Sequence, residues 1–317
     1  MKKITRRSFL QAAAVATVAG AFVACSSEEA TSTATSTSTS TASTDTSSSE
    51  ASSEASTASD LSGTLSLSGS SALYPLAEAA IDPYNELYPN VAIDLAKGGS
   101  GTGLSDVSTG MVDIGNSDVY AEEKLDAAAA AELVDHQVCI ASMACVINPG
   151  VGITDITTED LIKIFTCQVS NWSEVGGPDM DICLVTRPDS SGTRATFDAY
   201  ALEGNDEVES PNGLVTDDSG ELYATVKDTN GAIGYLSLSY LVAGYEGVEI
   251  VAIDGVEPTF ENIYAGNYAP WCYEHMYTKG EASELAASFI DFMMSDEFAP
   301  NIEAMGYGVA SKMTVSR

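Results

Sequence analysis

The sequence predicts an α/β fold built from two lobes, and three observations lead to this class. Short apolar runs typical of strands alternate with amphipathic helical segments along residues 61–317. The run at 138–148 is apolar at almost every position, as in a strand that is covered on both faces of a mainly parallel sheet. The 257 residues from 61 to 317 are enough for two lobes rather than one small domain.

The expected elements follow one another in a regular order. The first two strands alternate apolar and polar residues, and the helix between them has prolines near both ends. The helix at 157–165 opens with a threonine cap and an acidic first turn, which suits a helix N-terminus. We expect strands at 64–69, 91–96, 138–148, 182–186 and 248–253, and helices at 72–89, 157–165 and 284–307.

The first 60 residues have a different character from the rest of the chain. A twin arginine, Arg6-Arg7, precedes an alanine-rich apolar run at 9–24 that is too short for a membrane-spanning helix, so residues 1–24 are interpreted as a twin-arginine-like export signal. The four residues that end at Cys25 resemble a bacterial lipobox, which predicts lipidation of Cys25; an ordinary signal with an incidental cysteine is the alternative. Residues 25–60 are almost entirely Ser, Thr, Ala, Asp and Glu, which predicts a disordered tether.

Charge excludes one class of partner. The chain holds 46 acidic and 13 basic residues, and four of the basic ones precede Cys25. The part after the signal therefore has nine basic residues and a formal charge of −37. Nucleic-acid binding needs clustered Lys and Arg, so we expect no nucleic-acid partner.

Cysteines and histidines do not form a recognisable metal motif. Cys139 and Cys145 lie on one expected strand, about 20 Å apart, which is too far for a disulfide. No Cys-x-x-Cys pair or Cys/His spacing is present, so we expect no metal and no cofactor. His136 and His275 are interpreted as surface or packing residues.

Three short stretches share one physical character. Residues 68–75, 97–106 and 187–200 each follow an expected strand and place Ser, Gly or Thr at the start of a helix. Free backbone N–H groups and the helix dipole favour an anion there, and Arg187 stands in the third stretch. Plain helix caps, and a surface pair between Arg187 and Asp189, are the simpler alternatives. Neither a P-loop lysine nor a Gly-x-Ser-x-Gly elbow is present, so enzymatic activity is not expected.

These stretches resemble a known family. The segments GSSALYPLAE, GGSGTG, VDIGNSD, IFTCQVSNWSEVGG, RPDSSGTRATF, GAIGYLSLSYL and IDGVEPTFENI occur in that order, and together they resemble the phosphate-binding lipoproteins of Pst-type ABC importers over nearly all of 61–317. The resemblance implies a type II periplasmic-binding-protein fold with a two-strand hinge. It also implies a monomer that is anchored outside the cytoplasm by lipid, binds inorganic phosphate between its lobes and delivers it to an ABC permease.

The resemblance also implies lobe boundaries and site residues. Lobe 1 would comprise 61–146 and 266–317, and lobe 2 would comprise 147–265. Arg187 would bind phosphate oxygens and would be oriented by Asp189. Asp118 would accept a hydrogen bond from the proton of HPO4 2−, which would disfavour sulfate. The remaining phosphate-binding residues would be Ser71, Ala72, Leu73, Ser100, Ser191, Gly192 and Thr193.

The sequence departs from the family pattern at three places. Ala72 stands where many relatives have a hydroxyl residue, Cys167 stands where glycine is usual, and residues 268–278 replace a Tyr-Pro-Leu-x-Arg stretch. For Arg194, ligand contact and a salt bridge within a lobe remain equal alternatives. For the whole protein, binding of sulfate or molybdate, and phosphate sensing without transport, remain the alternatives.

Overall fold

The computed structural model describes residues 61–242 and 246–317. The predicted signal at 1–24, the lipidation site Cys25 and the tether at 25–60 lie outside the described residues. Within the described part, none of the helices has the length and apolar character needed to span a bilayer.

Strands and helices alternate along the described chain, which confirms the α/β class. The strands are β1 (Ser62–Gly69), β2 (Asn90–Lys97), β3 (Ile114–Ser117), β4 (Leu133–Ile147), β5 (Asp155–Ile156), β6 (Cys183–Thr186), β7 (Leu214–Val215), β8 (Ala232–Ser237), β9 (Glu249–Ile253) and β10 (Trp271–Lys279). The α-helices are α1 (Tyr74–Leu87), α2 (Ser100–Thr109), α3 (Ala127–Ala130), α4 (Thr158–Phe165), α5 (Gly192–Tyr200), α6 (Ser219–Asp228), α7 (Ser239–Val242), α8 (Phe260–Tyr264), α9 (Glu284–Met293) and α10 (Ala299–Ala304). Short 3₁₀ segments lie at Ala121–Glu123, Trp172–Val175 and Ala310–Lys312.

The sheet is mixed rather than mainly parallel. Its strands follow the order β2-β1-β3-β10-β4-β8-β6-β7, with β9 pairing with β4 and β5. The pairs of β1 with β2 and β3, and of β6 with β7 and β8, are parallel, as expected for strands joined by helical crossovers. The strands around β4 and β10 are antiparallel. The long strands in the middle therefore make the sheet mixed.

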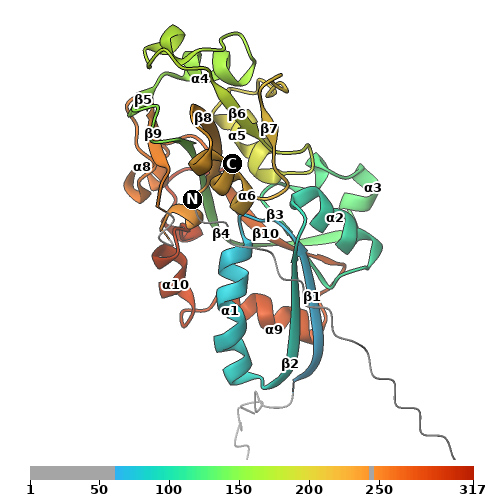
Figure 1. Ribbon diagram of the computed structural model, residues 1–317. Helices are drawn as coiled ribbons and strands as arrows, with labels where there is room; N and C mark the ends of the chain where they lie inside the picture. The colour runs from blue at the N-terminus through green and yellow to red at the C-terminus, as the bar shows by residue number, and fades with distance from the viewer. Residues whose placement is uncertain (1–60, 243–245) are drawn as a thin grey trace, which may run out of the picture. The chain divides into compact units, whose positions relative to one another are not determined.

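Strand β4 connects the two groups of strands. Its first part pairs with β10, and its last part, from Met143 to Ile147, pairs with β8 and β9. Figure 1 shows β4 and β10 next to one another in the middle of the sheet. Every residue of β4 from Val138 onward is buried, which agrees with the uninterrupted apolar run in the sequence. The predicted lobe boundaries fall at the end of β4 and just after α8, and they remain predictions.

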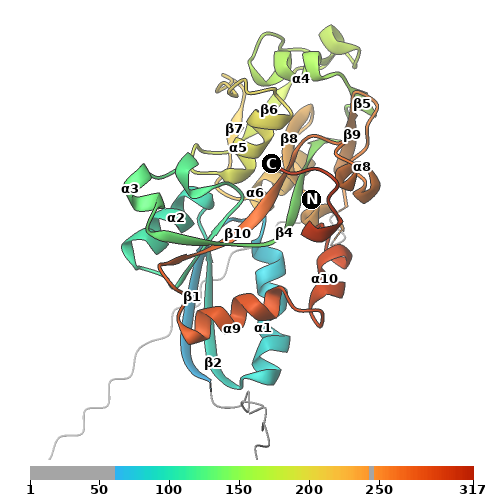
Figure 2. The same ribbon diagram turned by 180° about the vertical axis from the view of Figure 1, so that it is seen from behind.

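Helix α1 is held in place by aromatic packing against α9. Figures 1 and 2 both show the two helices side by side against β1 and β2. Tyr84 of α1 is fully buried. Its ring and that of Phe289 of α9 form a T-shaped pair with ring centroids 5.2 Å apart, and the Tyr84 hydroxyl donates to Ser288 Oγ at 3.1 Å. This packing fixes the direction of α1 and therefore the position of the loop that precedes it.

Helix α2 touches the backbone of β1 and β3, which only glycine allows. A Cβ atom added to Gly103 would lie 2.6 Å from Asn116 O and 2.7 Å from both Gly69 Cα and Ser68 O. A Cβ on Gly115 would lie 2.4 Å from Gly103 O. The missing side chains let the N-terminus of α2 approach the end of β3 closely.

We predict that Gly103→Ala lowers the free energy of unfolding by about 1–3 kcal/mol, because the new methyl group meets backbone atoms that cannot turn away. Urea unfolding would measure the change. Ser105→Ala, on the exposed side of the same helix, is the matched control and should change stability little. Equal stabilities of the two variants would show that α2 does not depend on the close approach.

Candidate anion-binding site

The structure brings the three predicted Ser/Gly/Thr stretches together. They form the loop before α1, the N-terminus of α2 and the N-terminus of α5. A Cβ on Gly192 would lie 2.1 Å from Ser100 Oγ and 2.8 Å from Asp118 Cβ, so the start of α5 lies directly against the start of α2 and the end of β3. The predicted residues of these stretches, and Asp118 after β3, are all buried: Ser71, Ala72, Leu73, Ser100, Asp118, Arg187, Ser191, Gly192 and Thr193.

Asp118 is the common acceptor of this cluster. It follows β3, and its two carboxylate oxygens accept hydrogen bonds from Ser70 Oγ and, at 2.8 Å, from Thr193 Oγ1. Its backbone N–H donates to Ser100 Oγ at 2.9 Å. Residues from three different segments therefore hold Asp118 in place, two of them through its carboxylate oxygens and one through its backbone N–H.

Ser70 is a residue that sequence reasoning missed. Its hydroxyl donates to Asp118 and accepts from the N–H groups of Ala72 at 3.1 Å and Leu73 at 3.0 Å. These are the two N–H groups predicted to bind phosphate, and in this structure they are directed at Ser70 Oγ. The pair of serines before α1 was the available signal, since a hydroxyl at a helix start commonly accepts from N–H groups two and three positions later.

Ser191 caps α5 rather than pointing to another element. Its hydroxyl accepts from the backbone N–H of Arg194 at 3.1 Å, which is the contact expected of a plain helix cap. Thr193, two residues further on, makes the contact with Asp118 instead. The backbone of the preceding residue, Ser190, accepts from Gly101 N at 2.8 Å and so ties α5 to α2.

Arg187 is buried with neutral acceptors around its guanidinium group. Only 1% of the residue is exposed, although it carries a permanent charge. Its Nε donates to Thr216 O at 3.0 Å and its terminal nitrogens donate to Asp217 O at 2.9 Å and Ser219 Oγ at 3.2 Å. A longer contact of 3.4 Å reaches Ser71 Oγ. Within the described residues, no carboxylate hydrogen-bonds or pairs with this guanidinium group.

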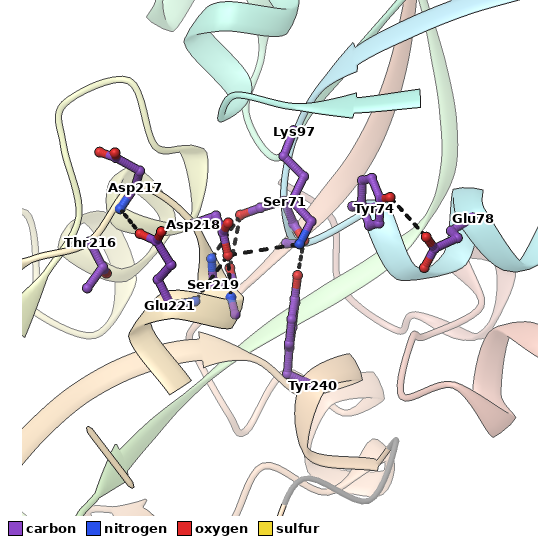
Figure 3. A network of polar contacts seen from close by, with 12 residues as sticks. Ser71, Tyr74, Glu78, Lys97, Thr216, Asp217, Asp218, Ser219, Glu221 and Tyr240 are labelled. Carbon is purple, nitrogen blue, oxygen red and sulfur yellow. Dashed lines mark hydrogen bonds and ion pairs between the residues drawn. The ribbon is translucent and has the colours of Figure 1, made fainter. Parts of the chain in front are cut away.

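A fourth helix start, that of α6, takes part in the site and was not predicted. Figure 3 shows Ser71 pointing at Ser219, the first residue of α6. The two hydroxyl oxygens are 3.0 Å apart, and Ser219 N donates to Ser71 Oγ at 3.3 Å. Tyr240 fixes Ser71 from the other side by donating to its carbonyl oxygen at 2.9 Å. The segment before α6 resembles an ordinary acidic helix cap, so only the folded chain identifies it as part of the site.

The predicted orienting contact between Asp189 and Arg187 is absent from this arrangement. The Asp189 carboxylate lies 2.8 Å from Arg194 Nη1, and 95% of the Asp189 side chain is exposed. Arg187 extends inward to Thr216 and Asp217, whereas Asp189, beyond Pro188, faces outward. The carbonyl groups of residues 216 and 217 orient Arg187 instead.

Arg194 belongs to a salt-bridge cluster next to the site. Besides Asp189, its Nε lies 3.1 Å from Glu207 and 3.4 Å from Asp198, and its Nη1 donates to Arg187 O at 3.0 Å. Three carboxylates therefore surround the Arg194 guanidinium group. The structure therefore favours the salt-bridge alternative for Arg194 and places it behind the backbone of Arg187.

Burial makes the two inner carboxyl groups of this cluster weaker acids. Burial, together with the charge of Asp198, raises the pKa of Glu207 to about 7, against the opposing effects of the Tyr235 hydroxyl and Arg194. Burial also raises the pKa of Asp198 to about 6, against the effect of Arg194. Both groups therefore take up protons near neutral pH.

The described histidines and cysteines have structural surroundings. His275 is buried, its Nδ1 lies 2.7 Å from Asp135 Oδ1, and its ring stacks on Tyr277. The cysteines of the described chain are free, and no group of His, Cys, Asp and Glu side chains within it has the geometry of a metal site. Cys167 has a φ of 57°, in the left-handed region that favours glycine, which explains why glycine suits this position.

Comparison with known sequences places the site in a family context. The model of the PBP superfamily domain matches residues 28–297. The phosphate-binding protein PstS of Bacillus subtilis is 49% identical over 259 residues, which cover 81% of this chain and 84% of that protein. The phosphate-binding protein PstS of Borreliella burgdorferi is 26% identical over 251 residues, which cover 77% and 88% of the two chains.

Solved structures show the same fold. A protein from Clostridium perfringens, assigned as a phosphate ABC transporter substrate-binding protein and crystallised with bound phosphate, matches with a TM-score of 0.71 and 30% identity over 78% of this chain and all of that one. An ABC-type phosphate transport receptor from Vibrio cholerae matches with a TM-score of 0.61 and 26% identity, covering 77% and 99% of the two chains. These matches confirm the type II periplasmic-binding-protein fold expected from the sequence.

We predict that Glu207 makes stability depend on pH near neutrality. The folded state keeps the Glu207 proton up to about pH 7, whereas the unfolded state loses it near 4.5, so the free energy of unfolding should fall as pH rises through this window. In Glu207→Gln this fall should shrink by an amount on the order of 2–3 kcal/mol, as measured by urea unfolding at a series of pH values.

The exposed neighbour Glu209 provides the control. Glu209→Gln should keep the pH profile of the unaltered chain. A Glu207→Gln profile that coincides with that of the control would show that Glu207 titrates alike in the folded and unfolded states.

Proposed function

The chain belongs to the PBP superfamily and, within it, to the phosphate-binding PstS proteins, and on this basis we propose that it captures inorganic phosphate and delivers it to an ABC permease. The relatives are named as phosphate-binding or phosphate-transport proteins, and one of the related structures holds phosphate. This is binding rather than catalysis, so the protein is not an enzyme and needs no cofactor.

The buried guanidinium group of Arg187 carries this proposal. A buried charge is costly unless a partner of opposite charge compensates it, and backbone carbonyls and hydroxyls compensate it only in part. Arg187 has such neutral acceptors around it and lies among the starts of α1, α2, α5 and α6. A tetrahedral oxyanion supplies the missing charge and accepts from the hydroxyl and N–H donors of these helix starts. The proposed phosphate-binding residues are Ser71, Ala72, Leu73, Ser100, Asp118, Arg187, Ser191, Gly192 and Thr193.

The carboxylate of Asp118 favours phosphate over other oxyanions as the ligand. A carboxylate can only accept, and HPO4 2− has a proton to donate whereas sulfate has none at neutral pH. The Asp118 carboxylate accepts from Ser70 and Thr193 and keeps lone pairs that can accept from a ligand proton. Sulfate and molybdate, the alternative ligands of this fold, would be repelled by it.

The proposed setting is the outer side of the cell membrane. The twin-arginine-like signal, the lipobox that ends at Cys25 and the tether suit a lipid-anchored monomer that closes two lobes on its ligand before it meets the permease. Phosphate sensing without transport uses the same cleft, and the relatives favour transport.

We predict that Arg187→Lys lowers phosphate affinity by about tenfold to hundredfold. Lysine keeps the charge but loses the fork geometry that binds an oxyanion through two hydrogen bonds, and each hydrogen bond to a charged group is worth roughly 1.5–3 kcal/mol. Titration calorimetry of the protein from residue 61 onward would measure it. Arg194→Lys is the matched control: it should lower stability through the contacts with Asp198 and Glu207 and change phosphate affinity less. Equal losses of phosphate affinity in the two variants would show that Arg187 is no more important for binding than Arg194.

We also predict that the unaltered protein strongly prefers phosphate to sulfate and that Asp118→Asn narrows this preference, chiefly by admitting sulfate. Asparagine can donate as well as accept, so the repulsion between a carboxylate and a sulfate oxygen disappears. Both affinities are measured in one protein by competition calorimetry, which makes the ratio independent of the fraction of active protein. A ratio that stays the same in Asp118→Asn would favour a site that only donates hydrogen bonds.

A further inference from the structure

Glu274 of β10 lies beside Asp118, the residue that follows β3. Strand β10 runs antiparallel to β3, with His275 opposite Ser117, Met276 opposite Asn116 and Tyr277 opposite Gly115. Glu274 precedes His275 and Asp118 follows Ser117, so both residues adjoin the last pair of this register. Glu274 also lies within 268–278, one of the segments that departs from the family pattern.

The Glu274 carboxyl group is completely buried and lacks an ordinary partner. None of the residue is exposed to solvent. Neither carboxyl oxygen accepts a hydrogen bond from any of the described residues. The titratable groups that interact with Glu274 are Asp118 beside β3, Cys139 of β4, Cys272 of β10 and Tyr307 after α10. None of these is a cation. Burial and the adjacent Asp118 charge raise the pKa of Glu274 well above its ordinary value.

Two facing carboxyl groups become partners when one of them holds a proton. A protonated carboxyl has an O–H donor, and its neighbour then accepts. Asp118 already accepts from Ser70 and Thr193, whereas neither oxygen of Glu274 accepts a hydrogen bond from a described residue. Ser70 is the hydroxyl near Glu274, and it is already engaged with Asp118. The proton therefore belongs on Glu274.

We propose that Glu274 is a positioning residue of the anion site, whose protonated carboxyl group donates a hydrogen bond to Asp118 and keeps Asp118 ionised and oriented toward the ligand. This proposal rests on the proposed function, because it assigns Glu274 to the phosphate site.

The arrangement accounts for the acceptor capacity of Asp118. Two carboxylate oxygens have about four acceptor positions. Ser70 and Thr193 occupy two of them, Glu274 takes a third, and one remains for the O–H of HPO4 2−. A neutral Glu274 also limits the buried negative charge beside a dianionic ligand to that of Asp118 alone. Both effects serve selective binding of a protonated oxyanion.

Two substitutions separate the hydrogen bond from the space that Glu274 fills. Glu274→Gln keeps the size and an N–H donor, so phosphate affinity and the phosphate-to-sulfate ratio should stay within about threefold of the original values. Glu274→Leu keeps most of the volume but removes the donor, so phosphate affinity should fall by about tenfold to hundredfold and the ratio should narrow. Calorimetry with inorganic phosphate and with sulfate measures both. Equal binding by the leucine variant and the unaltered protein, or equal losses in the two variants, would overturn the proposal.

Infrared spectroscopy tests the protonation directly and does not need ligand. The unaltered protein in slightly alkaline buffer should show a C=O stretching band of a buried protonated carboxyl group, and Glu274→Gln should lack it. A spectrum without this band, or a band that survives in Glu274→Gln, would overturn the proposal even if the leucine variant does not fold. Failure of the unaltered protein to bind phosphate would instead contradict the proposed function, and the infrared comparison would still decide the protonation of Glu274.

Discussion

A buried guanidinium group that is compensated by neutral acceptors is the constraint on which the rest of this structure depends. Arg187 is buried, so water cannot solvate its charge. Polar groups of the protein have to take the place of water, and they do so only if the side chain is held in one position. The carbonyl groups of Thr216 and Asp217 hold its fork from one side, and Ser71 and Ser219 lie on the other. This arrangement of a buried charge among neutral acceptors is the basis of the proposed anion site.

Close packing places the donors around this charge. Gly103 lets α2 touch the backbone of β1 and β3, and Gly192 lets the start of α5 touch Ser100 and Asp118. Both contacts exclude even a single Cβ atom, so the helix starts meet at distances that larger residues would prevent. The hydroxyl network of Ser70, Ser71 and Thr193 then fills the space between the helices without adding net charge.

The acidity of the chain makes local control of charge necessary. With a formal net charge of −33, the protein can attract an anion only where nearby carboxylates are paired, neutralised or turned away. Asp189 faces outward against Arg194, and burial raises the pKa of Glu207 and Asp198 toward neutrality. A protonated Glu274 behind Asp118 fits the same pattern. Asp118 itself accepts hydrogen bonds from Ser70 and Thr193.

The sequence by itself predicted the α/β class, the strands β1, β2, β4, β6 and β9, the helices α1 and α4, and the three Ser/Gly/Thr stretches, because apolar periodicity and Ser/Gly/Thr turns are local features. The run at 138–148, the helix at 157–165 and the helix start near Gly192 are examples, whereas the central strands β8 and β10 were not predicted. Contacts between distant segments were decided only by the tertiary structure. The antiparallel middle of the sheet, the contacts of Ser219, the pairing of Asp189 with Arg194 and the position of Glu274 beside Asp118 all bring together residues that are far apart in the sequence pattern. Register and side-chain direction decide such contacts, and both depend on packing across the whole sheet.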